Sequence, residues 1–224
     1  MDKLIRKIEI PLAKRAIEKA GLYIVQKKDV DRLAEIAADA YCDYPLHNWF
    51  TKGKYDAVAS RLIMQISLKT MTEDALIYAD SEELNGFAAW LPFGFTGSKT
   101  LPFLFSGGLK LILHSGLGII SRLLTYEKYA MGLKKEFTDN YDWYLYNLSI
   151  KKDAQGKGIA SKLMRPMLEF CDDERMVAYL ETNKESNVSL YNHYGFELMR
   201  EEVIPKTPVT HYSMLRHPCL EQKL

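Results

Sequence analysis

The sequence predicts a protein of the α/β (α+β) class, folded as one domain over residues 1–224. Two observations lead to this expectation. Apolar residues make up 47% of the chain and charged residues 26%, a composition typical of globular rather than disordered proteins. Segments rich in branched and aromatic residues also alternate with segments of helical periodicity. The length of 224 residues corresponds to one large domain, or to one domain with an insertion.

The net charge and the cysteines exclude several kinds of site and partner. With a formal net charge of +1, the chain lacks the global basic character of nucleic-acid-binding proteins. Cys42, Cys171 and Cys219 are too few and too widely spaced for a disulfide framework or a zinc site. We therefore expect no bound metal, no nucleic-acid partner and a reducing, cytoplasmic location.

The N-terminal part predicts a helical extension followed by a strand and a helix. Residues 1–20 have the pattern of a basic amphipathic helix, bent at Pro11 and with either a solvated basic face or a partner contact. Its expected apolar side consists of Leu4, Ile8, Leu12 and Ile17. A short strand is predicted at 22–26, and Asp29 is placed to cap the helix that follows.

The next elements are predicted to be a second helix and a hairpin. An aromatic connection, Tyr44–Phe50, precedes a helix whose apolar face carries Tyr55, Val58, Leu62 and Ile66. Residues 75–80 and 86–91 then read as two strands joined by a polar turn at 81–85.

Residues 92–138 are predicted to be a helical insertion between the third and fourth strands. The apolar positions at helical spacing are Leu109, Ile112, Leu113, Leu117, Ile120 and Leu124. Charged residues interrupt this stretch before it reaches the ~18 apolar residues that span a bilayer, so we expect no membrane partner. Two interpretations stay open: a helix buried on the core, or a wall or lid over a substrate.

The last third has the clearest pattern. Strands are predicted at 143–150, 176–182, 196–204 and 209–215. A polar loop at 151–156 leads into a helix that reaches Asp172 and that Pro166 should kink. A short helix at 187–194 should end at Gly195 in a left-handed conformation.

The loop Gln155–Ala160, between a strand and a helix, has the features of a phosphate-binding turn. Its two glycines allow close backbone approach, and the helix that follows offers free N–H groups and a positive dipole end. A P-loop does not fit because the Gly-Lys-Ser/Thr ending is absent. A dinucleotide fingerprint fits poorly because Ser161 replaces the third glycine and the first glycine lies far from the strand. A turn without a ligand stays open.

Two motifs together resemble the GNAT N-acetyltransferase superfamily over residues 143–196. A Gln/Arg-x-x-Gly-x-Gly/Ala signature matches Gln155, Gly158 and Ala160. A later Asn-x-x-x-Tyr-x-x-x-Gly-Phe pattern matches Asn187, Tyr191, Gly195 and Phe196. More narrowly, the segments 143–145 and 179–183 are similar to the puromycin N-acetyltransferase-like branch.

The resemblance implies a mixed, strongly twisted sheet of six to seven strands whose fourth and fifth strands splay apart around acetyl-CoA. The end of the fourth strand would offer backbone groups to the pantetheine arm through Leu148, Ser149 and Ile150. The pyrophosphate would lie on Gln155, Gly156, Lys157, Gly158, Ala160 and Ser161. Asn187 would hydrogen-bond the pantetheine arm, cap its own helix, or do both.

Two residues are predicted to move protons. The resemblance directs Tyr191 toward the CoA sulfur as a general acid, with core packing as the alternative. Glu181, at a strand end, is a candidate base or amine anchor, with a purely structural carboxylate as the alternative. Tyr144 and Asn147 lie where related enzymes place substrate-contacting groups.

The predicted reaction is direct acetyl transfer from acetyl-CoA to an amine in a ternary complex. A small-molecule amine is the expected acceptor, because the insertion would close the open groove that a peptide needs. The alternatives are a non-catalytic acyl-CoA-binding or sensor module and a protein N-acetyltransferase. We expect a monomer or a homodimer.

Overall fold

A computed structural model describes residues 2–72, 74–92, 103–138 and 142–219 of the chain. The α-helices are α1 (Asp2–Lys19), α2 (Val30–Ala40), α3 (Pro45–Phe50), α4 (Ala57–Met71), α6 (Leu109–Ser115), α7 (Leu117–Phe137), α8 (Ile159–Asp173) and α9 (Ser186–Asn192). Short helical turns are η1 (Lys27–Asp29), the π-helical η2 (Leu104–Gly108) and η3 (Lys152–Ala154). The strands are β1 (Tyr23–Ile24), β2 (Leu76–Ala79), β3 (Gly86–Pro92), β4 (Asp142–Ile150), β5 (Val177–Thr182), β6 (Glu197–Val203) and β7 (Thr210–Arg216).

The seven strands form one mixed sheet in the order β1-β2-β3-β4-β5-β7-β6. Only β4 and β5 pair in parallel, and the other neighbours in the described sheet are antiparallel. The parallel pair requires a crossover, which α8 provides between β4 and β5. The predicted fold class, a mixed sheet flanked by helices with a helical insertion between the third and fourth strands, is therefore confirmed.

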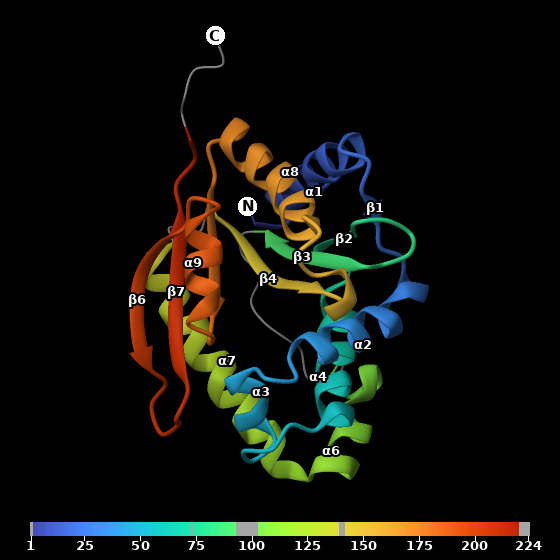
Figure 1. The fold of residues 1–224 in the computed structure, drawn as a ribbon, viewed down its shortest axis with the longest axis vertical. Helices are drawn as coiled ribbons and strands as arrows, with labels where there is room; N and C mark the ends of the chain where they lie inside the picture. Colours follow the sequence, from blue (N-terminus) through green and yellow to red (C-terminus); the bar gives the residue numbers. More distant parts are fainter. Residues whose placement is uncertain (1, 73, 93–102, 139–141, 220–224) are drawn as a thin grey trace.

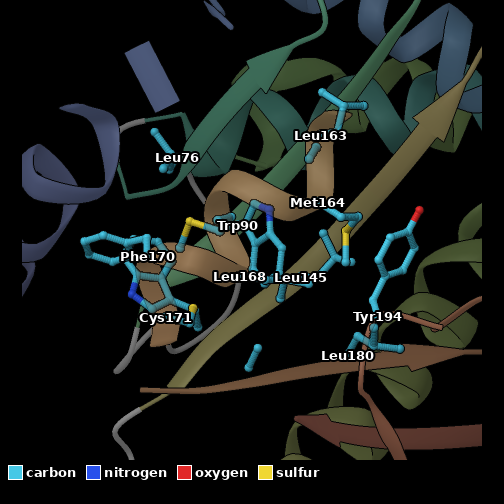
Figure 2. Close-up of a cluster of buried hydrophobic side chains, with 14 of the residues drawn as sticks. Leu76, Trp90, Leu145, Leu163, Met164, Leu168, Phe170, Cys171, Leu180 and Tyr194 are labelled. Atoms are coloured by element: carbon cyan, nitrogen blue, oxygen red, sulfur yellow. The ribbon is translucent and has the colours of Figure 1, made fainter. Parts of the chain in front are cut away.

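Helices cover both faces of the sheet (Figure 1). Helices α1 and α8 pack on one face, where Trp90, Leu145 and Leu163 belong to a buried cluster that Figure 2 shows in close-up. Helices α2 and α4 pack on the other face, around Leu33, Leu68 and other buried side chains. This double coverage explains why β2 and β3 are buried along their whole length rather than in alternation.

A third apolar cluster lies at the end of the molecule formed by α3, α4, α6 and α7 (Figure 1). Leu111 and Ile119 are fully buried there, against side chains of α3 and α4. Leu109, Leu113 and Leu117 of the same predicted apolar stripe are instead more than half exposed. The segment 103–138 therefore packs on the rest of the protein with only part of its apolar surface.

A β-bulge separates the two halves of β4. Ala89 pairs with Asn147 and Trp90 pairs with Leu145, which leaves Tyr146 as the extra residue of β4. A bulge bends its strand and increases the local twist. The pairing of β4 with β5 ends at Leu145, one residue before the bulge. Beyond this point the two strands separate, as the resemblance implied.

Several predicted boundaries and faces were wrong. The aromatic connection contains a helix, α3, because Pro45 at its first position is preorganised for one. The predicted helix through 109–124 is interrupted at Gly116, whose φ of 75° and ψ of 171° are not helical. The N-terminal helix buries Ile17 as predicted, but it buries Ala13 instead of Leu12, which is 39% exposed; the side chains of Leu4 and Ile8 lie outside the described part.

The cap proposed for Asn187 was also wrong. Helix α9 begins at Ser186 with Glu185 as its N-cap, so Asn187 lies inside the first turn.

Among the described residues, no helix is both long and apolar enough to cross a membrane.

Candidate active site

The loop after β4 presents two glycines in a conformation that other residues rarely adopt. Gly156 has a φ of 73° and Gly158 a φ of 78°, both in the left-handed region that favours glycine. A Cβ atom built at either position would meet no heavy atom within 4 Å. The backbone of this loop therefore borders open space, where a ligand could approach it closely.

The first turn of α8 adds free N–H groups to the loop. The first helical hydrogen bond runs from the Lys162 N–H to the Gly158 carbonyl, at 3.0 Å. The amides of Ile159, Ala160 and Ser161 precede that bond, so they have no acceptor within the helix. Free amides at the positive end of a helix dipole suit a phosphate group. The Ser161 hydroxyl lies 3.0 Å from the Tyr194 phenol oxygen, which connects this turn to the chain after α9.

The remaining predicted cofactor residues lie along the same path. Leu148, Ser149 and Ile150 pair with β3 on one side. On the other side they have no partner in β5, because the pairing of β4 with β5 ends at Leu145. Gln155 and Lys157 are exposed in the loop, and the Gln155 side-chain amide donates to the Ile150 carbonyl at 3.3 Å. The β4 edge and the loop thus form one continuous strip of backbone.

A cavity of about 450 Å³ lies on the insertion side of the separated strands. We call it the α4–α7 cavity, because residues of α4, α6 and α7, most of them apolar, form the larger part of its wall. Its polar end consists of Tyr44, Tyr126, Tyr144, Tyr146, Asn147 and Glu181. The bulge explains why both Tyr146 and Asn147 line the cavity, although adjacent strand residues normally point to opposite faces.

Glu181 is the carboxylate at this polar end, and three phenols donate to it. The donors are Tyr179 at 3.1 Å, Tyr144 at 3.3 Å and Tyr126 at 3.4 Å. Burial raises the pKa of Glu181 from 4.5 to about 7 and outweighs the three hydrogen bonds and the charge of Lys134, which lower it. A carboxyl with a pKa near neutrality can both accept and release a proton at physiological pH.

Asn147 presents an unsatisfied acceptor in the lining of the cavity. Its amide nitrogen donates to the Tyr41 phenol oxygen at 2.7 Å. Its side-chain oxygen is buried and has no hydrogen-bond partner among the described residues. Because a buried oxygen without a donor is costly, a ligand N–H group at this position would be stabilised.

Tyr191 lies in the core beside the separated strands, and it is 8% exposed. Burial raises the pKa of the Tyr191 phenol well above its usual value, and the nearby phenols of Tyr44 and Tyr194 raise it further. The phenol therefore stays protonated at neutral pH, as a proton donor must. Tyr191 is not among the described residues that line the α4–α7 cavity, so the structure brings Tyr144, Asn147 and Glu181 together there and leaves Tyr191 outside the lining.

A hydrogen-bonded group at the end of β5 contains Asn187. Its side-chain amide donates to the Thr182 hydroxyl at 3.1 Å, and that hydroxyl lies 2.8 Å from the Tyr44 phenol oxygen. The same phenol oxygen accepts from the Asn183 backbone N–H at 2.9 Å. Asn187 therefore helps to hold the end of β5 against the segment before α3.

Sequence reasoning missed the roles of Tyr44 and Tyr126 in the cavity. Tyr126 lies 55 positions before Glu181 and donates to it, and Tyr44 lies in the connection expected to be irregular. The only sequence signal was the high count of 14 tyrosines, which does not indicate which of them converge.

Parts of the chain are similar to known acetyltransferases. Residues 127–198 match the acetyltransferase (GNAT) domain family. An uncharacterized N-acetyltransferase of Schizosaccharomyces pombe is 33% identical over 89 residues, which are 38% of this chain. The match spans only 35% of the length of that relative.

Two solved structures share the fold over most of their length. A "histone acetyltransferase HPA2 and related acetyltransferase" of Corynebacterium glutamicum has a TM-score of 0.59 at 14% identity, covering 91% of this chain and 98% of that one. Arylalkylamine N-acetyltransferase 2 of Aedes aegypti has a TM-score of 0.56 at 18% identity, covering 88% of this chain and 97% of that one. The fold is thus that of GNAT acetyltransferases, and residues 127–198 match their domain family.

Proposed function

We propose that this protein moves the acetyl group of acetyl-CoA directly to the amine of a small molecule, in a ternary complex. One observation carries the proposal. A carboxyl with a pKa near 7, Glu181, lies in a cavity that meets the separated strands β4 and β5, and the Gly156–Gly158 loop follows the same β4 strand. An acceptor and a donor could then meet between the strands.

The residues present fit acetyl-CoA. The left-handed glycines and the free amides of α8 suit a pyrophosphate. The edge of β4 beyond the bulge suits the amide-rich pantetheine arm, because the backbone groups on the side opposite β3 no longer pair with β5. Acetyl-CoA would supply an activated thioester, whose carbon is the electrophile.

The chain would provide an acid and a base for the transfer. Glu181 would attract an incoming ammonium and take its proton, directly or through a water molecule, which leaves a neutral amine to attack the thioester carbon. A C–N bond forms as the C–S bond breaks, and the nitrogen, which is cationic after the attack, loses a second proton to water, so that Tyr191 can be reprotonated. Tyr191 would donate its phenol proton to the departing sulfur. Since a thiol pKa near ~8.5 makes the thiolate a tolerable leaving group, this donation assists the reaction rather than being essential.

A covalent intermediate on cysteine is a weaker candidate mechanism. Cys171 is buried, and burial raises the pKa of its thiol far above the usual value. A thiol held protonated in this way is a poor nucleophile.

The proposed acceptor is a small molecule because α6 and α7 close one side of the cavity. This proposal takes residues 1–224 as one domain, with residues 92–138 as an insertion that builds the acceptor wall. The arylalkylamine N-acetyltransferase that shares the fold acts, by its name, on a small amine. The similarity to the puromycin N-acetyltransferase-like branch stays a hypothesis, with an aminonucleoside as its predicted acceptor.

The test is release of the CoA thiol across a panel of amines, with mass spectrometry of each product. The panel should contain alkylamines, arylalkylamines, polyamines, amino acids, an aminonucleoside and a peptide with a free N-terminus. We expect thiol release that matches acetylated small amine. Binding of acetyl-CoA without transfer to any amine would favour the sensor module, and transfer to the peptide alone would favour a protein N-acetyltransferase.

A further inference from the structure

The α4–α7 cavity has two chemically different ends. Its polar end, at Glu181, is surrounded by phenol rings. The wall that leads away from Glu181 consists mainly of aliphatic side chains, among them Ile63, Ile66 and Ile120. A volume of about 450 Å³ lies within the range of ~300–1,000 Å³ typical of small-molecule sites.

The polar end suits a positively charged group, because two carboxylates, Glu181 and Glu127, line it. Among the described lining residues there is no lysine or arginine. His47 lines it too, but burial lowers the pKa of this imidazole to about 3, so it is neutral. The rings of Tyr126, Tyr144 and Tyr146 near Glu181 would add cation–π attraction for an ammonium.

The wall away from Glu181 offers little to a second polar group. Ser67 and Thr70 also line the cavity, but Thr70 donates to the Ser67 carbonyl at 3.0 Å, and the Ser67 hydroxyl bonds the Tyr146 phenol of the polar end. An apolar ligand would therefore leave neither hydroxyl without a partner. Glu127, the other carboxylate of the described lining, lies near the Tyr146 phenol at the polar end. A second ammonium placed further along the aliphatic wall would therefore lose its hydration without an ionic partner beside it, which is unfavourable.

The apolar wall continues to the molecular surface. Leu104 and Leu124 line the cavity and are 44% and 59% exposed. Leu113 and Leu117 are also exposed, at 78% and 73%, but they lie outside the described lining. A chain that starts at Glu181 would thus stay on apolar surface until it reaches solvent.

We infer that the acceptor is a primary amine on an apolar body, an alkyl or arylalkyl chain. Its ammonium binds at Glu181, and its chain lies along α4, α6 and α7 toward Leu124. The inference rests on the proposed function, because it takes the α4–α7 cavity as the acceptor site. It goes further by excluding polyamines and amino acids as the preferred acceptors.

The first test compares the kcat/KM of ethylamine, butylamine, hexylamine and octylamine with that of diaminohexane. Burial of each methylene contributes enough to raise kcat/KM about fourfold per buried carbon. Diaminohexane, which has the length of hexylamine plus a second charge, should be at least ~10-fold poorer than hexylamine. A flat series, or a preference for diaminohexane or an amino acid, would overturn the inference while leaving acetyl transfer intact.

The second test uses two leucines of α7. Leu124→Asn makes the outer wall polar and should reduce kcat/KM about 10-fold for octylamine, with little change for ethylamine. Leu117→Asn is the matched control, because Leu117 is exposed on the same helix but outside the described lining. It should leave the whole series unchanged. Equal effects of both variants would contradict binding along the cavity wall.

A third measurement separates the inference from the proposed function. The thermal shift caused by octylamine and by diaminohexane can be recorded without any turnover. If no amine is acetylated and octylamine still stabilises the protein more than diaminohexane does, the amine site stands and the proposed function fails. If neither amine shifts the melting temperature and neither is acetylated, both fail.

Discussion

Replacement of Glu181 by glutamine should change both the stability and the activity of the protein with pH. Glu181 is partly buried among three phenols, and its pKa rises from 4.5 to about 7. One pKa unit corresponds to 1.36 kcal/mol. Ionising this carboxyl in the folded protein therefore costs at most about 3 kcal/mol more than ionising it in the unfolded chain. Glutamine keeps the shape of the side chain and has no charge.

The sign of the effect follows from the raised pKa. Below pH 4.5 both states hold the proton, and the full contribution of the protonated carboxyl to stability is present. As the pH rises through about 7, the unfolded chain has already lost its proton and the folded protein must lose its own, so this contribution disappears. Glu181→Gln should thus gain stability relative to wild type between these pH values. At pH 8 the gain corresponds to at most about 7–14 °C in melting temperature.

The activity should respond at the same pH. In the wild type, kcat/KM reports the ionisation of the free enzyme and should rise tenfold per pH unit below about 7. Glu181→Gln should reduce kcat/KM at neutral pH by about 10²-fold or more and recover partly at high pH, where the amine loses its proton unaided. Glu202→Gln is the control. Glu202 lies on the edge strand β6, accepts a hydrogen bond from the Tyr129 phenol at 2.6 Å and is not among the described lining residues.

Two results would refute this reasoning. If Glu181→Gln keeps the wild-type rate and the same ionisation near pH 7, the carboxyl is not the base. If its melting temperature follows that of the wild type at every pH from 4 to 9, burial does not raise the pKa of Glu181.

The remaining predictions concern the donor side. Gly158→Ala should destabilise the fold by about 1–2 kcal/mol, because φ is 78° there, and should weaken acetyl-CoA binding in calorimetry. The control is Gly21→Ala, at a φ of 72° with equally open space, which should lower stability by a similar amount without affecting binding. Unchanged acetyl-CoA affinity in Gly158→Ala would mean that the loop is only a turn. Tyr191→Phe should keep acetyl-CoA affinity and slow single-turnover transfer about 10²-fold; a wild-type rate would exclude the phenol as the acid. Acetyl-CoA at ~100 times its Kd should add about 2.7 kcal/mol, or about 5–10 °C, and a larger shift with NADH would favour a dinucleotide site instead.

The sequence predicted the C-terminal part of the fold well, because its signals are local. A glycine in the left-handed conformation was expected at position 195, and Gly195 has a φ of 83°. The strands β4 to β7 lie close to their predicted ranges, since turns and hydrophobic runs mark their ends. The mixed sheet followed from the resemblance rather than from periodicity.

The acceptor side could be predicted only in part. Glu181 and Tyr144 were identified from their positions on strands, and both line the α4–α7 cavity. The phenol of Tyr126 reaches Glu181 only because α7 packs across the end of the sheet, which is a tertiary contact without a local signal. The bulge at Tyr146 likewise depends on the register between β3 and β4, which the sequence of one strand does not specify.

The most direct test of the account is a single-turnover experiment with labelled acetyl-CoA. The protein is first saturated with labelled acetyl-CoA, and octylamine is then added in a rapid mixer, with the protein and the products analysed by mass spectrometry. Direct transfer between bound partners predicts that one acetyl group per protein molecule appears on the amine, with no acetylated protein at any time point. Label on Cys42 or another protein side chain before it appears on the amine, or label released only as acetate, would contradict direct transfer at this site.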